Sequence, residues 1–115
     1  MITAAILFAI AAVAGVIMAL IRFTGRDYPP AALAAIHGLF AAAGLIALLL
    51  IAFGAGVSSS MRIALLLFVI AALGGFWLLS YHVKKRALPI PLMVTHALIA
   101  VIAFIILIVG ILNHA

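Results

Sequence analysis

Two histidines, His37 and His96, are the residues of this sequence best suited to chemistry. Each is a titratable ring within a long apolar run, and each stands seven residues after a proline, Pro30 or Pro89. The two segments lie 59 residues apart. A neutral imidazole can form hydrogen bonds, transfer a proton or ligate a metal ion. The matched spacing predicts that the two rings lie at equal depth and face each other.

Small residues follow both histidines on the faces that their helices would share. Steps of four and seven residues stay on one face of a helix, and from either histidine they reach only alanine or glycine. This leaves a slot beside each imidazole for a flat cofactor, and imidazoles from two helices can supply the axial ligands of a haem iron. We therefore predict two metal ligands, His37 and His96, and a cofactor lined by Ala41, Gly44, Ala100 and Ala103.

The elements that must hold these rings are strongly apolar. The chain has 115 residues, of which 72% are hydrophobic and 6% are charged, and a soluble domain of this size cannot bury so much apolar surface. Four apolar runs are each long enough to cross a hydrocarbon core of about 30 Å as a helix. We predict an all-α integral membrane protein with a single four-helix transmembrane domain over residues 1–115, its spans covering 2–22, 31–53, 62–82 and 89–112.

The basic residues predict how the bundle is oriented in the membrane. Five of the six lie in or beside the first and third connections, which must be on the same side of a four-span protein. The excess of Lys and Arg in cytoplasmic loops predicts that loops 23–30 and 83–88 are cytoplasmic and that both termini are outside, as in a bacterial inner membrane. The serines of the middle connection, 54–60, are predicted to cap the third span.

The offset of 59 residues extends beyond the histidines and predicts two tandem hairpins, residues 1–56 and 57–115, related as a parallel repeat. It aligns Gly15 with Gly74 and Arg26 with Lys85. Small residues also recur at spacings of four, which permits close helix approach within lipid. We expect these pairs to serve packing inside the bundle, although a dimer interface is the alternative: Ala11 with Gly15, Gly38 with Ala42, and Ala71 with Gly75.

With four spans and a matched histidine pair, the chain resembles the four-helix membrane b-type cytochromes, whose haems are held by histidines from different helices. The resemblance covers the helix count and the pair His37 and His96, and several of those proteins bind two haems through four ligands, where this chain has two deep histidines. It implies one haem b near the cytoplasmic side, a role in electron transfer, and a quinone as a redox partner. The haem propionates would then pair with basic residues of the loops, namely Arg22, Arg26, Lys84, Lys85 or Arg86.

Other interpretations of these histidines remain open. A membrane histidine can instead bond a carbonyl or a hydroxyl, such as that of Thr95, and the chain would then be a non-catalytic accessory subunit of a larger membrane complex. His82, beside Tyr81 and one turn beyond Trp77, is expected to anchor its helix at the headgroups, with a quinone site as the alternative. The terminal His114 is expected to be exposed.

The residues that are missing narrow the function further. The chain has no cysteine and a single carboxylate side chain, Asp27, which lies in a loop. Small multidrug transporters need a carboxylate within the membrane, and hydrolases and phosphoryl transferases need residue sets that are absent here. We expect the partners to be the lipid bilayer and other membrane subunits or further copies of the chain, and not nucleic acid, because the positive charge lies at helix ends.

Overall fold

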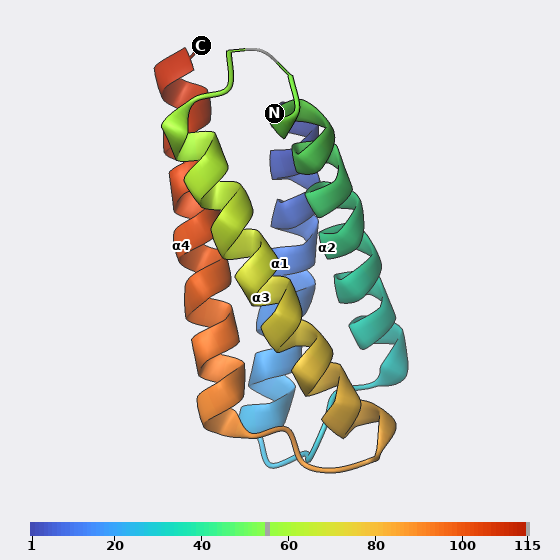
Figure 1. The fold of residues 1–115 in the computed structure, drawn as a ribbon. Helices are drawn as coiled ribbons and strands as arrows, with labels where there is room; N and C mark the ends of the chain where they lie inside the picture. Colours follow the sequence, from blue (N-terminus) through green and yellow to red (C-terminus); the bar gives the residue numbers. More distant parts are fainter. Residues whose placement is uncertain (55, 115) are drawn as a thin grey trace.

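The computed structural model describes residues 1–54 and 56–114, apart from the side chain of His114, and in these ranges it has four helices. They form an up-and-down bundle (Figure 1), in which both termini and the 53–58 connection lie at one end and the two shorter loops at the other. The four predicted spans are confirmed, with boundaries that differ by at most three residues. The elements are α1 (Ile2–Phe23), α2 (Ala31–Ala52), α3 (Ser59–Val83) and α4 (Ile90–His114).

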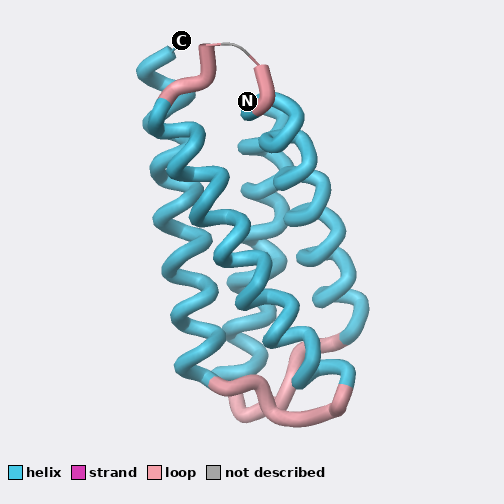
Figure 2. Tube along the Cα trace, viewed as in Figure 1, coloured by secondary structure: helices cyan, strands magenta, loops and turns pink. Residues whose placement is uncertain are grey.

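The helices begin where the sequence supplies a start signal. The Ser58 hydroxyl accepts a hydrogen bond of 3.3 Å from the Met61 N–H, which confirms the predicted serine cap of α3. Pro30 and Pro89 directly precede α2 and α4, where a residue without an N–H costs no helical hydrogen bond. The tube in Figure 2 shows how short the connections between the helices are.

The outer surface of the bundle is apolar on all four helices. Leu39 of α2 and Leu73 of α3 are 71% and 65% exposed, and no polar or charged residue of the described chain is buried. The bundle measures 45 Å along its axis and 19 Å across, which matches a bilayer of about 40–45 Å with its headgroups. All four helices are long and apolar enough to cross a membrane. The chain is therefore a small integral membrane protein in contact with lipid.

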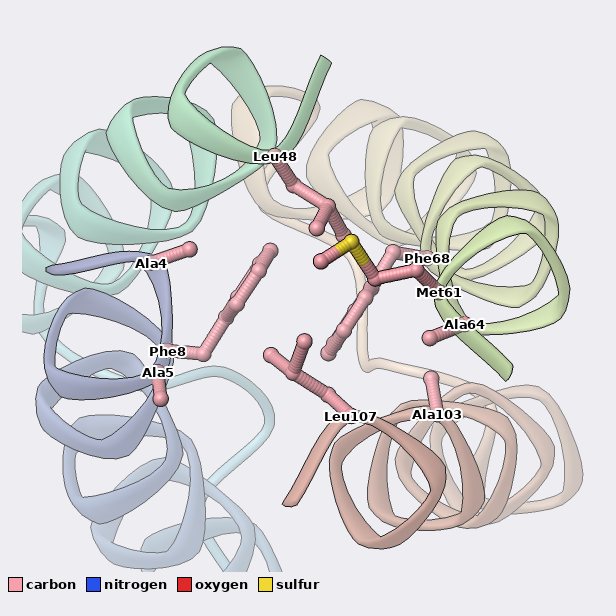
Figure 3. Close-up of a cluster of buried hydrophobic side chains, with 9 residues drawn as sticks. All are labelled: Ala4, Ala5, Phe8, Leu48, Met61, Ala64, Phe68, Ala103 and Leu107. Carbon is pink, nitrogen blue, oxygen red and sulfur yellow. The ribbon is translucent and has the colours of Figure 1, made fainter. Parts of the chain in front are cut away.

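The core lies where the two hairpins meet, α1 with α2 and α3 with α4. Viewed along the axis, Phe8 of α1 and Phe68 of α3 project to the centre from opposite corners (Figure 3). Their rings stack in parallel, with centroids 3.8 Å apart. Small and branched side chains fill the remaining space around this stack, the buried ones being Ala4, Ala5, Leu48, Met61, Ala64, Ala103 and Leu107.

The two hairpins are related by an approximate twofold axis along the bundle, and the contacts refine the offset of the repeat. Equivalent residues of α2 and α4 differ by 59, as for His37 and His96, whereas those of α1 and α3 differ by 60, as for Phe8 and Phe68. The difference arises because the loop over 84–89 is one residue shorter than the loop over 24–30. Gly15 therefore corresponds to Gly75, and the sequence alignment of Gly15 with Gly74 is one residue out of register.

Reciprocal hydrogen bonds tie the hairpins together at the loop end. The Arg22 Nε–H of α1 donates to the Leu88 carbonyl at 3.0 Å, and His82 Nε2 of α3 bonds the Pro29 carbonyl at 2.7 Å. These are equivalent positions, 60 apart in the helices and 59 apart in the loops. The Tyr28 ring also meets the His82 ring edge to face. His82 thus holds the loop of the opposite hairpin, a role that its position in the sequence did not indicate.

Candidate functional site

The structure brings His37 of α2 and His96 of α4 together inside the bundle. Their ring centroids are 6.1 Å apart and the ring planes are inclined by 77°. Each histidine is the seventh residue of its helix, so both lie about 10 Å from the loop end at 1.5 Å of rise per residue. The prediction that the two rings lie at equal depth and close together is confirmed.

A backbone carbonyl orients each imidazole. Nδ1 of His37 bonds the Ala11 carbonyl of α1, and Nδ1 of His96 bonds the Ala71 carbonyl of α3, both at 2.7 Å. A carbonyl only accepts, so Nδ1 must carry the proton. In an apolar bundle the neutral ring is favoured over the charged one, which leaves a lone pair on Nε2. This is the arrangement by which proteins orient histidines that ligate metals.

Glycines in α1 and α3 allow this close approach. A Cβ atom on Gly15 would lie 3.0 Å from Cε1 of His37, and one on Gly75 would lie 3.2 Å from Cε1 of His96. Each glycine is one turn beyond the alanine whose carbonyl holds the same ring. The pairs Ala11–Gly15 and Ala71–Gly75 are thus sockets for the histidines. Packing inside the bundle, the use expected for these pairs, is confirmed, whereas their pairing with the histidines was missed.

The small residues predicted to line a cofactor lie farther from the rings. A Cβ on Gly44 would be 3.1 Å from the Phe8 ring, and Ala103 is fully buried in the cluster around the two phenylalanines. Both residues therefore make room for the aromatic stack, one layer beyond the histidines. Ala41 and Ala100, one turn from the histidines, are half-buried.

The basic residues predicted to meet the propionates are all at the loop end. Arg22 bonds the Leu88 carbonyl and, at 3.5 Å, the Arg26 carbonyl. Arg26 and Lys85 are exposed. The structure thus gathers positive charge at the end of the bundle nearer to the histidines, without bringing any of these side chains into a recorded contact with the rings.

The pair offers two nitrogen ligands and no further donor set. Within the described residues there is no group of three or more His, Cys, Asp or Glu side chains that could hold a bare metal ion. Neither Nε2 has a recorded hydrogen bond, and neither is a sealed, unpartnered polar atom. Two nitrogens meet the requirement of a haem iron, because the macrocycle supplies its other four ligands.

Comparison of the chain with protein-family models, curated proteins and solved structures finds no match. The functional argument is carried by the histidine pair and its surroundings.

Proposed function

We propose that this membrane protein binds one haem b between His37 and His96 and transfers electrons within the membrane. The observation that carries the proposal is the pairing of the two rings on opposite helices, each with Nδ1 bonded to a carbonyl. The haem, when bound, supplies an iron that cycles between two oxidation states.

The spacing of the rings supports this donor set. Two imidazoles that ligate one metal from opposite sides, with metal–nitrogen distances of about 2 Å, have ring centroids about 6 Å apart. The centroids of His37 and His96 are separated by 6.1 Å. The carbonyls of Ala11 and Ala71 would keep each Nδ1 protonated, so that Nε2 is the ligating atom and neither ligand brings a charge into the apolar core.

The remainder of the chain would contribute orientation and surroundings. Apolar helices exclude water, and the exposed cations Arg26 and Lys85, with Arg22 beside them, give the propionates a positive end of the bundle to meet. A quinone dissolved in the bilayer is the redox partner that such surroundings favour.

The test is a reduced-minus-oxidised visible spectrum of the protein, purified in mild detergent after expression with ample haem. We expect sharp b-type bands at one haem per chain, and their loss in both His37→Ala and His96→Ala. His82→Ala is the matched control, because it removes a histidine that bonds a loop carbonyl outside the pair, and it should retain the bands. Circular dichroism establishes that each variant is helical.

A featureless spectrum from well-folded protein would overturn the haem proposal. The carbonyl-bonded histidines would then be interhelical hydrogen bonds in an accessory subunit of a larger membrane complex. Such a subunit is colourless and co-purifies with its partner in fixed stoichiometry.

A further inference from the structure

A small polar pocket lies at the loop end of α3, apart from the histidine pair. Its volume is about 120 Å³, and it is lined by Trp77, Ser80, Tyr81, Lys84 and Arg86. Trp77 is 60% exposed, and Lys84 and Arg86 are exposed as well. The pocket therefore opens onto the outside of the bundle, where the end of a transmembrane helix meets the lipid headgroups.

The lining of this pocket favours an anion. Lys84 and Arg86 bring two positive charges, and the Tyr81 hydroxyl and the Trp77 indole N–H are further donors. The Ser80 hydroxyl donates to the Trp77 carbonyl at 2.5 Å, so its oxygen is left as an acceptor. None of the lining residues is acidic.

The turn after α3 brings one of these cations back onto the helix. The Arg86 N–H bonds the Tyr81 carbonyl at 2.9 Å and the Lys85 N–H bonds the His82 carbonyl at 3.1 Å. Together with the positive φ of Lys85, 54°, these bonds form the turn that often ends an α-helix. They hold Arg86 beside Tyr81, on the same side as Lys84.

The first hairpin lacks this pocket chemistry although its backbone is equivalent. The positions of α1 that correspond to Trp77, Ser80 and Tyr81 hold aliphatic residues, and Thr24 corresponds to Lys84; the aliphatic residues are Ile17, Leu20 and Ile21. Packing in lipid at this end of a helix thus needs none of the polar groups. Their presence in one hairpin alone points to a ligand.

We propose that this pocket binds the phosphate of an anionic phospholipid headgroup. A headgroup phosphate lies at the depth where interfacial Trp and Tyr are found, and basic pockets at the ends of membrane helices attract anionic lipid. The pocket is independent of the proposed haem site, since none of its lining residues touches either histidine in a recorded contact.

The chain carries its own reporter for the test, because Trp77 is its only tryptophan. The protein is placed in phosphatidylcholine vesicles that contain a minor fraction of phosphatidylglycerol, with bromine, which quenches tryptophan fluorescence, on the acyl chains of either lipid. We expect brominated phosphatidylglycerol to quench Trp77 as though enriched about tenfold over its bulk fraction. The double variant Lys84→Gln/Arg86→Gln should quench as the bulk fraction dictates.

A matched variant and a competition experiment complete the test. Lys85→Gln removes a neighbouring charge that does not line the pocket and should keep most of the enrichment. Equal quenching by the two brominated lipids in folded wild-type protein would overturn the proposal, as would an enrichment unchanged in the double variant. Inorganic phosphate at millimolar concentration should not displace the lipid when compared with chloride at equal ionic strength; selective displacement by phosphate would assign the pocket to a soluble phosphate instead.

Discussion

At the scale of single residues, two histidines are held by two contacts each. A carbonyl one turn before a glycine accepts the Nδ1 proton, and the glycine leaves room for the ring. The arrangement recurs in both hairpins, with Gly15 beside His37 and Gly75 beside His96. A side chain larger than hydrogen at either glycine would push the ring away from its carbonyl.

Gly15→Val tests this socket. The added side chain would overlap the space of the His37 ring, and such overpacking typically costs about 1–3 kcal/mol. We expect lower resistance to unfolding in a denaturing detergent titration and, with haem supplied, weaker or shifted b-type bands. Gly38→Val is the control, because a Cβ at Gly38 meets nothing within 4 Å and the residue is exposed. Equal stability of the two variants would contradict the socket.

At the scale of helices, the two hairpins differ most where their first helices end. Gly25 follows α1 with a φ of 106°, and the equivalent residue after α3 is Lys85, with a φ of 54°. A left-handed conformation suits glycine and is unfavourable for a residue with a Cβ. The turn at Lys85 is therefore a strained position.

Lys85→Gly should stabilise the protein. Relief of the left-handed conformation outweighs the greater freedom of glycine in the unfolded chain, for a gain of about 0.5–1 kcal/mol. Lys84→Gly, at a φ of −80°, should instead destabilise, since it gains flexibility without relieving strain. Denaturing detergent titrations of both variants give the comparison. A loss of stability in Lys85→Gly would show that the turn after α3 is not left-handed.

The bond from Arg22 to the opposite loop is the second prediction at this scale. Arg22→Met removes a charged donor from the Leu88 carbonyl, which lies in a buried residue, and we expect a loss of about 1–3 kcal/mol. Arg26→Met removes the same charge from an exposed side chain and should change stability by less than about 0.5 kcal/mol. Thermal unfolding in detergent distinguishes them. Similar losses in both would mean that the charge, and not the hydrogen bond, matters.

At the scale of the whole molecule, the bundle separates its charges by end. Both short loops, with five of the six basic residues in or beside them, lie at one end, while Arg62 and both termini lie toward the other. This polarity underlies the prediction that loops 23–30 and 83–88 are cytoplasmic.

Single cysteines test this orientation without background, because the chain has no cysteine of its own. Ser59 and Ala87 are exposed residues near opposite ends. In intact cells, a membrane-impermeant maleimide should label Ser59→Cys and leave Ala87→Cys unlabelled until the membrane is permeabilised. The reverse pattern would invert the orientation and place the histidine pair nearer the outer surface.

The sequence by itself determined the four helices, their approximate limits and the equal depth of His37 and His96, because apolar length, prolines and repeat spacing are local properties of the chain. The tertiary structure alone decided which groups meet. The Ala11 and Ala71 carbonyls, the register of Gly15 with Gly75 and the exchange of bonds between Arg22 and His82 depend on how hairpins pack. Nearly every residue of such a chain is apolar, so the pattern does not distinguish inward from outward faces, and only packing assigned Gly44 and Ala103 to the phenylalanine layer.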